Sequence, residues 1–251
     1  MNVGVWLSSV MFALFTWYTS PSCACSSNDV VIGIDIGHTK KQSGAISARG
    51  VPEFVFNQSL ATVIANELAA AGMTRGFLIN ADGRIGSLED RPAEALLHHA
   101  DLFLSVHHDS VQPQYLLPWI VNRARRLYSD RFHGYSLFVS NKNPAYSDSL
   151  RFASLIGSEM LKRGFSPTLH HAEPISGENR LLLNRELGIY QYNDLVVLKK
   201  SELPSVLIEA GIIVNRDEES NLTEPAYQAQ IAAAIVSAAQ AFCVGLTKAN
   251  P

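Results

Sequence analysis

The feature that most constrains the fold is an alternation of continuous apolar runs with segments of helical period. Apolar runs typical of strands buried on both faces lie at residues 30–36, 76–79, 100–106, 134–140 and 205–210. Segments with helical spacing of apolar residues lie between or after them, at residues 53–71, 88–100, 147–164 and 225–244. This order predicts an α/β fold, a single domain with a mostly parallel twisted sheet and helices on both faces. Residues 195–198 are expected to add a short strand or edge segment.

The composition supports one well-packed domain and gives no sign of a nucleic-acid partner. The chain has 251 residues, of which 47% are hydrophobic and 17% charged. Its formal net charge is -3, and nucleic-acid binding would require a concentrated basic face.

The N-terminus has the character of an export signal. Residues 5–18 are apolar and uncharged, and small residues follow up to Cys25. The stretch has the length of a signal-peptide core and is too short to span a bilayer comfortably. We therefore expect residues 1–25 to be a signal peptide and residues 26–251 to be the mature domain. Cys25 also stands where a lipoprotein signal would place its lipidated residue, but the usual Leu three residues earlier is missing, so simple cleavage is favoured.

Two His and two Glu residues lie at the ends of predicted strands or at the start of a predicted helix, on one side of the sheet. His38 and His107 come directly after strand-like runs, and Glu53 opens a helix. In an open parallel sheet, ligands gather at the carboxyl ends of the strands. Two imidazoles and one carboxylate are a ligand set of catalytic zinc, with one position left open. Spacing alone leaves open whether His107 or His108 is the ligand, since neighbours in a strand point to opposite faces.

The fourth residue, Glu209, ends the strand at residues 205–210. An acid among the apolar residues of that strand would have a raised pKa, which suits a general base that takes a proton from water near neutral pH. The alternative is a buried Glu paired with Arg180 or Arg185.

Other polar residues carry weaker signals. Asp35 is open between orienting a ligand histidine and making a purely structural hydrogen bond. His170 and His171 favour a polar loop rimming the cleft over a second metal site, because neighbouring His side chains rarely both reach one ion. Glu178 and Arg180 are candidates for substrate binding.

Residues 111–133 form an insertion that does not fit the alternation. The segment is aromatic and holds four Arg against one Asp. Because it follows His107, we expect it to border the site. Two interpretations are about equally supported: a helical insertion whose aromatic residues pack on the core, or a substrate-binding or regulatory surface.

Several of these segments together resemble a known enzyme family. The segments are Asp35-Ile36-Gly37-His38, the helix-opening Glu53, and residues 88–91, 100–107 and 204–211 with Asn215. They are similar to those of the zinc-dependent N-acetylmuramoyl-L-alanine amidases of the AmiC/CwlV type, from about residue 30 to the C-terminus. Two departures stand out: only Gly44 and Ala45 remain of a usually Gly-rich stretch, and His108 replaces a usually small residue.

The resemblance implies a specific activity. It implies one Zn²⁺ per chain bound by His38, Glu53 and His107, with Glu209 as the catalytic acid-base. Family members hydrolyse the amide between N-acetylmuramic acid and L-alanine of the stem peptide, so the expected partners are peptidoglycan or muropeptides.

The same resemblance implies a cellular context. We expect an exported monomer, periplasmic or associated with the outer membrane in a Gram-negative cell, and an activator protein that the sequence does not identify. The alternatives are a zinc peptidase or deacetylase acting on another cell-wall amide, and a non-catalytic wall-binding module. The presence of all four residues together disfavours the last.

Overall fold

The computed structural model describes residues 30–249. The predicted signal peptide, including Cys25, lies outside the described residues. Within the described part, no helix has both the length and the apolar character needed to cross a membrane.

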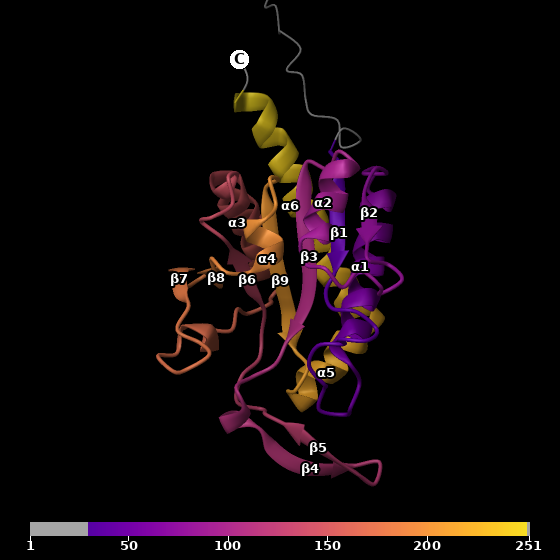
Figure 1. The fold of residues 1–251 in the computed structure, drawn as a ribbon, viewed down its shortest axis with the longest axis vertical. Helices are drawn as coiled ribbons and strands as arrows, with labels where there is room; N and C mark the ends of the chain where they lie inside the picture. The colour runs from indigo at the N-terminus through magenta and orange to yellow at the C-terminus, as the bar shows by residue number, and fades with distance from the viewer. Residues whose placement is uncertain (1–29, 250–251) are drawn as a thin grey trace, which may run out of the picture.

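A seven-stranded sheet forms the centre of the molecule, in the order β2-β1-β3-β9-β6-β8-β7 (Figure 1). The strands are β1 Ile32–Ile36, β2 Phe77–Ile79, β3 Leu102–Asp109, β6 Ser136–Val139, β7 Leu181–Asn184, β8 Ile189–Gln191 and β9 Ser205–Ile212. The first four in spatial order are parallel, whereas β6 runs antiparallel to β9, and β7 antiparallel to β8. The predicted mostly parallel sheet is confirmed.

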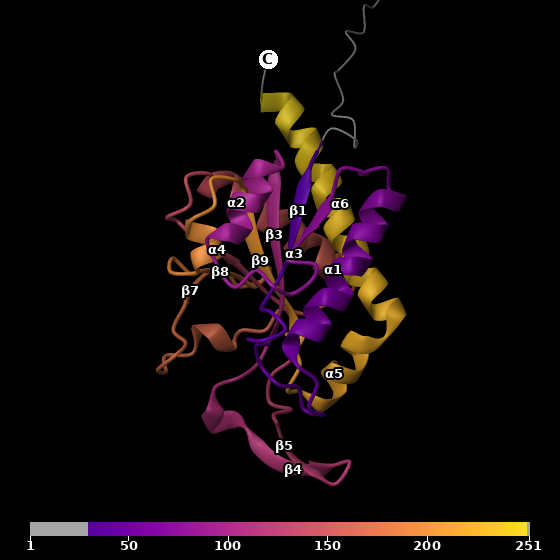
Figure 2. The ribbon, with the colours of Figure 1, turned by 45° about the vertical axis from the view of Figure 1, so that its right-hand side comes forward.

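Helices cover both faces of the sheet, as predicted (Figure 2). One face carries α1 Glu53–Ala70, α3 Tyr146–Lys162 and α6 Pro225–Ala249. The other carries the shorter helices α2 Asp90–Leu97 and α4 Val196–Lys199. The remaining helix is α5 Arg216–Thr223, and two 3₁₀ turns are η1 Pro113–Tyr115 and η2 His170–Ala172.

The pleat of the central strands decides which side chains face which helices. Leu104 and Val206 lie in the core under α1, α3 and α6, whereas Phe103 and Leu207 lie in the smaller core under α2 and α4. Successive residues of a strand point to opposite faces. The odd-numbered His107 and Glu209 therefore emerge on the face of α2 and α4, at the carboxyl ends of β3 and β9.

Two elements differ from the sequence-based expectation. Residues 195–198, expected as a strand or edge segment, contribute to helix α4, which buries Val197 and Leu198 in the smaller core. In so short an apolar run, periodicity does not distinguish a strand from a single helical turn. The elements against which the run packs decide its secondary structure. The second element, the antiparallel pair of β7 and β8, was not predicted.

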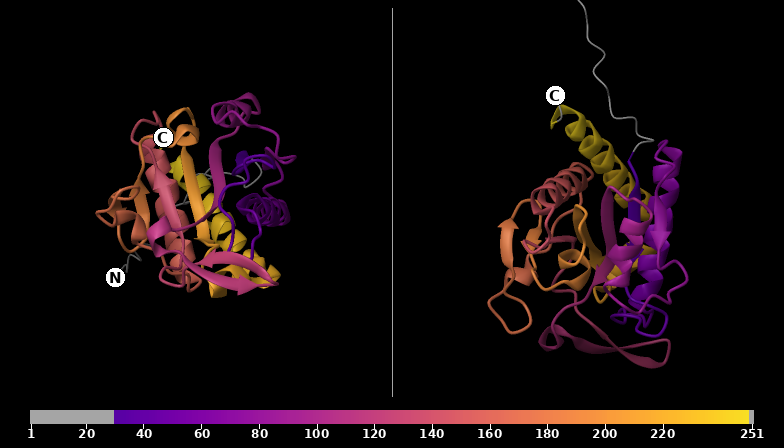
Figure 3. Two further views of the ribbon diagram at one scale, coloured as in Figure 1. Left: turned by 60° about the horizontal axis from the view of Figure 1, so that its bottom comes forward. Right: turned by 45° about the horizontal axis from the view of Figure 1, so that its top comes forward.

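The insertion at residues 111–133 is a β-hairpin, so the helical interpretation is wrong. Strands β4 Leu117–Val121 and β5 Ala124–Tyr128 pair antiparallel. Asn122 and Arg123 connect them with φ of 52° and 63°, the left-handed conformation that a tight hairpin turn requires. The hairpin extends across the end of the molecule at which the parallel strands terminate (Figure 3). Trp119 anchors it, since Nε1 donates to the carbonyl oxygen of Ala48 at 2.9 Å.

Candidate functional site

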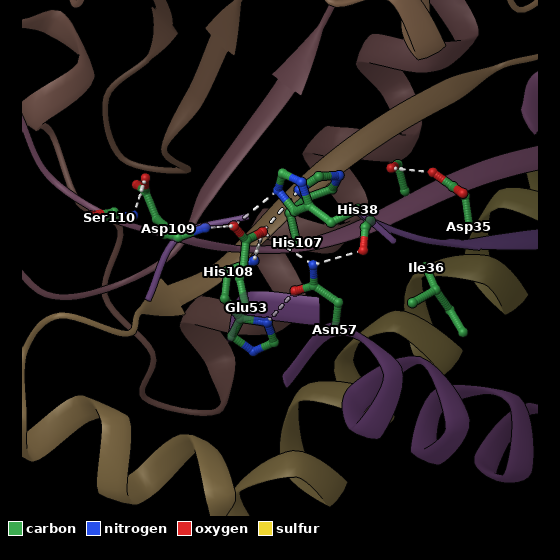
Figure 4. Close-up of polar contacts among 12 residues, drawn as sticks. Asp35, Ile36, His38, Glu53, Asn57, His107, His108, Asp109 and Ser110 are labelled. Carbon is green, nitrogen blue, oxygen red and sulfur yellow. Dashed lines mark hydrogen bonds and ion pairs between the residues drawn. The ribbon is translucent and has the colours of Figure 1, made fainter. Parts of the chain in front are cut away.

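The three predicted ligand residues converge at the carboxyl ends of β1 and β3 (Figure 4). His38 lies just after β1, Glu53 is the first residue of α1, and His107 lies in β3. The Glu53 carboxylate lies between the two rings, with Oε2 2.9 Å from Nε2 of His38 and Oε1 3.1 Å from Nδ1 of His107. The sequence thus predicted which three side chains meet, and their role as ligands stays a prediction.

The donor set and the space around it fit a zinc ion. The potential ligand atoms of the three side chains lie within 4.8 Å of one another. Two glycines keep the backbone close to them: a Cβ on Gly37 would lie 2.3 Å from Nε2 of His107, and one on Gly44 would lie 2.3 Å from Oε2 of Glu53. The Gly44 that the sequence retains from the usual Gly-rich stretch therefore occupies a position at which a larger residue would collide with the site.

Burial alone would raise the pKa of Glu53, because desolvation penalises a carboxylate. Hydrogen bonds with His107 and His38, and the charges of those two rings, outweigh this and lower the pKa well below its ordinary value. Glu53 is therefore an anionic carboxylate over the whole physiological pH range.

A buried arginine holds the backbone of His38 in a strained conformation. His38 has φ 66°, which is uncommon for a residue other than glycine. Its carbonyl oxygen accepts hydrogen bonds from Nη2 of Arg91 at 2.6 Å and from Nδ2 of Asn80 at 2.7 Å. Arg91 also donates to Asp35 at 3.0 Å, and Asp35 accepts a further bond from Ser105 at 2.7 Å.

These contacts settle the role that the sequence left open for Asp35. Its two carboxylate oxygens accept from Arg91 and Ser105 and not from a histidine ring. The interpretation of Asp35 as the residue that orients a ligand His is therefore wrong. Asp35 is linked to the site through Arg91, which also donates to the carbonyl oxygen of His38.

We expect the substitution Arg91→Met to lower the free energy of unfolding by about 3–5 kcal/mol, because it leaves the Asp35 carboxylate buried without its cation. Urea denaturation measures this loss. The control is Arg84→Met, whose pair with Asp82 is largely exposed and should contribute less than about 1 kcal/mol. Equal stabilities of the two variants would contradict the structural role of Arg91.

The structure distinguishes His107 from His108. His108 points to the opposite face, where its Nδ1 lies 2.8 Å from Oδ1 of Asn57 (Figure 4). Burial lowers the pKa of His108 to about 3, so its ring is neutral. Asn57 in turn donates from Nδ2 to Oε1 of Glu53 at 3.1 Å. His108 therefore orients the side-chain amide of Asn57, and this amide orients Glu53. Sequence reasoning missed these roles of His108 and Asn57.

Glu209 lies beside His107, because the two residues are paired in the register of β3 and β9. Its Oε2 is buried and has no hydrogen-bond partner among the described residues. Burial raises the pKa of Glu209 well above its ordinary value, and the negative charges of Asp109 and Glu53 raise it further.

The alternative of a Glu209–arginine pair is wrong for the part of the chain that the structure describes. The guanidinium of Arg180 lies over the ring of Tyr192, 3.8 Å from its centroid, and donates to backbone carbonyls. Arg185 is exposed. Glu209 thus keeps a buried oxygen that is free to accept a proton.

Two cavities open beside these residues on the face of α2 and α4. One of about 190 Å³ is lined by His38 and His107, and another of about 140 Å³ by Glu209. Leu195 and Leu207 border both cavities, so they adjoin.

The predicted substrate residues Glu178 and Arg180 line the cavity of Glu209. Glu178 is engaged within the protein: it lies 2.8 Å from Nδ1 of His171 and accepts from Gln112 at 2.8 Å. Burial would lower the pKa of His171, but Asp109 and Glu178 outweigh it and raise the pKa to about 9. Substrate contacts of Glu178 and Arg180 stay a prediction.

The insertion borders this region only through its ends. Gln112 reaches Glu178, and the ring of Phe132 stacks on His170 at 5.1 Å between centroids. The hairpin itself contacts the Ala48 loop and Arg216, which lies over Tyr128 at 3.9 Å.

A comparison with known protein families agrees with this geometry. The family model described as N-acetylmuramoyl-L-alanine amidase, Amidase_3, matches residues 32–241. The chain belongs to this amidase family. The protein described as probable N-acetylmuramoyl-L-alanine amidase AmiB of Haemophilus influenzae is 26% identical over 259 residues, covering 96% of this chain and 58% of that protein. The chain thus spans little more than half the length of that relative.

Solved amidase structures share the fold. The amidase Ami1 of Mycobacterium smegmatis superposes with a TM-score of 0.66 at 20% identity, covering 85% of this chain and 96% of that one. The amidase CwlD of Clostridioides difficile, solved in complex with the GerS lipoprotein, gives a TM-score of 0.57 at 20% identity, covering 85% of this chain and 98% of that one.

Proposed function

We propose that this chain is a zinc-dependent peptidoglycan hydrolase that cleaves the amide between N-acetylmuramic acid and L-alanine of the stem peptide. The observation that supports it most is the convergence of His38, Glu53 and His107 beside Glu209, on adjacent strands of the amidase fold. One Zn²⁺ held by the first three residues would act as a Lewis acid on the amide carbonyl and lower the pKa of water.

The protein's own residues supply the proton transfers. Glu209 accepts the proton of the attacking water at its unpaired Oε2 and delivers it to the nitrogen of L-alanine, which leaves as an amine. Its raised pKa suits both steps, since a carboxyl that holds a proton too weakly is a poor acid. Leu195 and Leu207 line the adjoining cavities with apolar surface beside this transfer.

The context of the reaction belongs to the same proposal. An exported or periplasmic location, a monomeric chain and an activator protein stay predictions. The complex of CwlD with a lipoprotein supports the activator, because it shows one protein of this fold bound to a protein partner.

Metal removal and product analysis test the proposal. We expect a chelator such as 1,10-phenanthroline to abolish release of stem peptides from purified sacculi, and added Zn²⁺ to restore it, because two imidazoles and a carboxylate bind zinc reversibly. Mass spectrometry should find stem peptides with a free L-alanine amine. The control is the same chelator saturated with zinc beforehand.

The products also separate the alternatives. Cleavage between two amino acids would identify a peptidase, and release of acetate would identify a deacetylase. Either product would contradict the proposed bond specificity while leaving the metal site intact.

A further inference from the structure

A second group of metal-ligating side chains lies outside the cluster of His38, Glu53 and His107. His170 and His171 form a 3₁₀ turn in the loop between α3 and β7, and Asp109 ends β3. Oδ2 of Asp109 lies 2.8 Å from Nε2 of His171 and 3.3 Å from Nε2 of His170. The sequence disfavours such a site because adjacent histidines rarely reach one ion, but here the 3₁₀ turn directs both rings to one oxygen atom.

The outward nitrogen of each ring has a partner of its own. Nδ1 of His170 lies 2.9 Å from Oγ1 of Thr168, and Nδ1 of His171 lies 2.8 Å from Oε2 of Glu178. Metal-binding histidines characteristically engage the second ring nitrogen in this way, which fixes the ring and leaves the other nitrogen for the ion. Gln112 extends this support by donating to Glu178.

His170 provides an independent sign of a missing ligand. The residue is 2% exposed, and its Nε2 is buried; the contact with Asp109 at 3.3 Å does not have the geometry of a hydrogen bond, and no other residue among 30–249 bonds this atom. Leaving a buried polar atom unpaired costs about 1–3 kcal/mol, so such an atom calls for a specific explanation. Nε2 faces Asp109, at the place where an ion would lie.

The local charge also favours a cation. Asp109 and Glu178 form ion pairs only with His170 and His171 within the described part of the chain. The nearby arginines are engaged elsewhere: Arg180 lies on Tyr192, and Arg131 pairs with Glu173. No guanidinium group pairs with Asp109 or Glu178 in the described part of the chain, so a divalent cation would take the place of the proton of His171 between these two carboxylates.

We propose that Asp109, His170 and His171 bind a second divalent cation, of the borderline class that accepts nitrogen and oxygen ligands, such as Zn²⁺. Two of its ligands come from the loop between α3 and β7 and one from β3, so the ion joins this loop to the central sheet. The same loop carries Glu178 and Arg180 to the cavity of Glu209. The cation therefore holds one wall of the proposed active site in place.

Metal stoichiometry tests the proposal. After dialysis of the purified full chain against buffer with added Zn²⁺ and then metal-free buffer, elemental analysis should find about two equivalents in the wild type. His170→Asn keeps a polar atom near the position of Nδ1 and removes Nε2, and should retain about one equivalent. The matched control His99→Asn changes an exposed histidine with φ 54° and should keep both.

A variant of the other cluster separates this proposal from the proposed function. His38→Ala should also retain about one equivalent, whereas His38→Ala with His170→Asn should retain none. One equivalent in the wild type that is lost with His38→Ala and kept in His170→Asn would overturn the second site alone. One equivalent that is lost only with His170→Asn would overturn the first cluster instead.

Hydrogen exchange provides a readout that does not depend on activity or on counting metal. Added Zn²⁺ should slow amide exchange in residues 168–180 of the wild type and of His38→Ala, and should have no such effect in His170→Asn. If His170→Asn fails to fold, Asp109→Asn replaces it in both measurements. Equal exchange of this segment with and without Zn²⁺ in the wild type would overturn the proposed role of the ion.

Discussion

Replacement of Glu209 by glutamine is expected to reduce kcat for amide hydrolysis by a factor of about 10²–10⁴, the usual contribution of a general acid-base. Glutamine has nearly the same shape but cannot accept and return a proton at Oε2, the buried atom that has no hydrogen-bond partner among the described residues. Zinc content should be unchanged, because Glu209 is not one of the three residues that converge on the proposed metal position. Kinetics on soluble muropeptides and elemental analysis measure the two quantities.

The pH profile gives a second measure of the same group. Glu209 must be ionised to accept a proton, so activity should be lost as the pH falls through its raised pKa. The acidic limb of kcat/KM should therefore lie above the ordinary pKa of 4.5 for a Glu side chain, and it should disappear in Glu209→Gln. Glu202→Gln, which changes an exposed residue near the start of the same strand, is the matched control. Full activity of Glu209→Gln would exclude this mechanism even if the substrate were correct.

The substitution Gly44→Ala is expected to cause loss of zinc and, with it, of activity. The new methyl group would lie 2.3 Å from Oε2 of Glu53 and 2.7 Å from Nε2 of His38, so both ligands would have to move. Displacing residues that merely support a metal ligand already weakens binding by about 10–100-fold, and here two proposed ligands themselves would be displaced. Zinc affinity, measured by competition with a chromophoric chelator, should fall by at least that factor.

A second glycine separates this steric effect from backbone strain. Gly164 has φ +84°, close to the +76° of Gly44, but a Cβ there would have no neighbour within 4 Å. Gly164→Ala should therefore lose about 1–2 kcal/mol of stability, the cost of alanine in a left-handed conformation, and keep its zinc. If Gly44→Ala kept full zinc affinity, Glu53 and His38 would not form the metal site.

The fold was largely predictable because its strongest signals are local. Strands β1, β3 and β9 are buried on both faces, so each is a continuous apolar run, and the helices between them carry their own period. The errors fall where a local signal is weak. Residues 195–198 are too few to show a period, and the hairpin at residues 117–128 depends on a turn at Asn122 and Arg123 that lacks glycine. Its five-residue aromatic and branched strands were nevertheless a signal that could have been found.

The site was predictable only in part, because a sequence shows which groups follow a strand but not what they touch. His38, Glu53 and His107 were identified from their places at the ends of strands and at the start of a helix. The choice between the two roles of Asp35 stayed open, because its partners Arg91 and Ser105 come from two other elements. The support that His108 gives to Glu53 passes through Asn57, a helical residue with no motif of its own.

The sequence by itself determined the alternating α/β order, the side of the sheet on which chemistry gathers, and the four residues proposed to carry it. These follow from the periodicity of side chains along one chain. Only the tertiary structure decided that His107 rather than His108 faces Glu53, that Glu209 keeps an unpaired buried oxygen, and that Asp109 meets His170 and His171. Each of these depends on register and on the packing of segments distant in sequence, which no local pattern encodes.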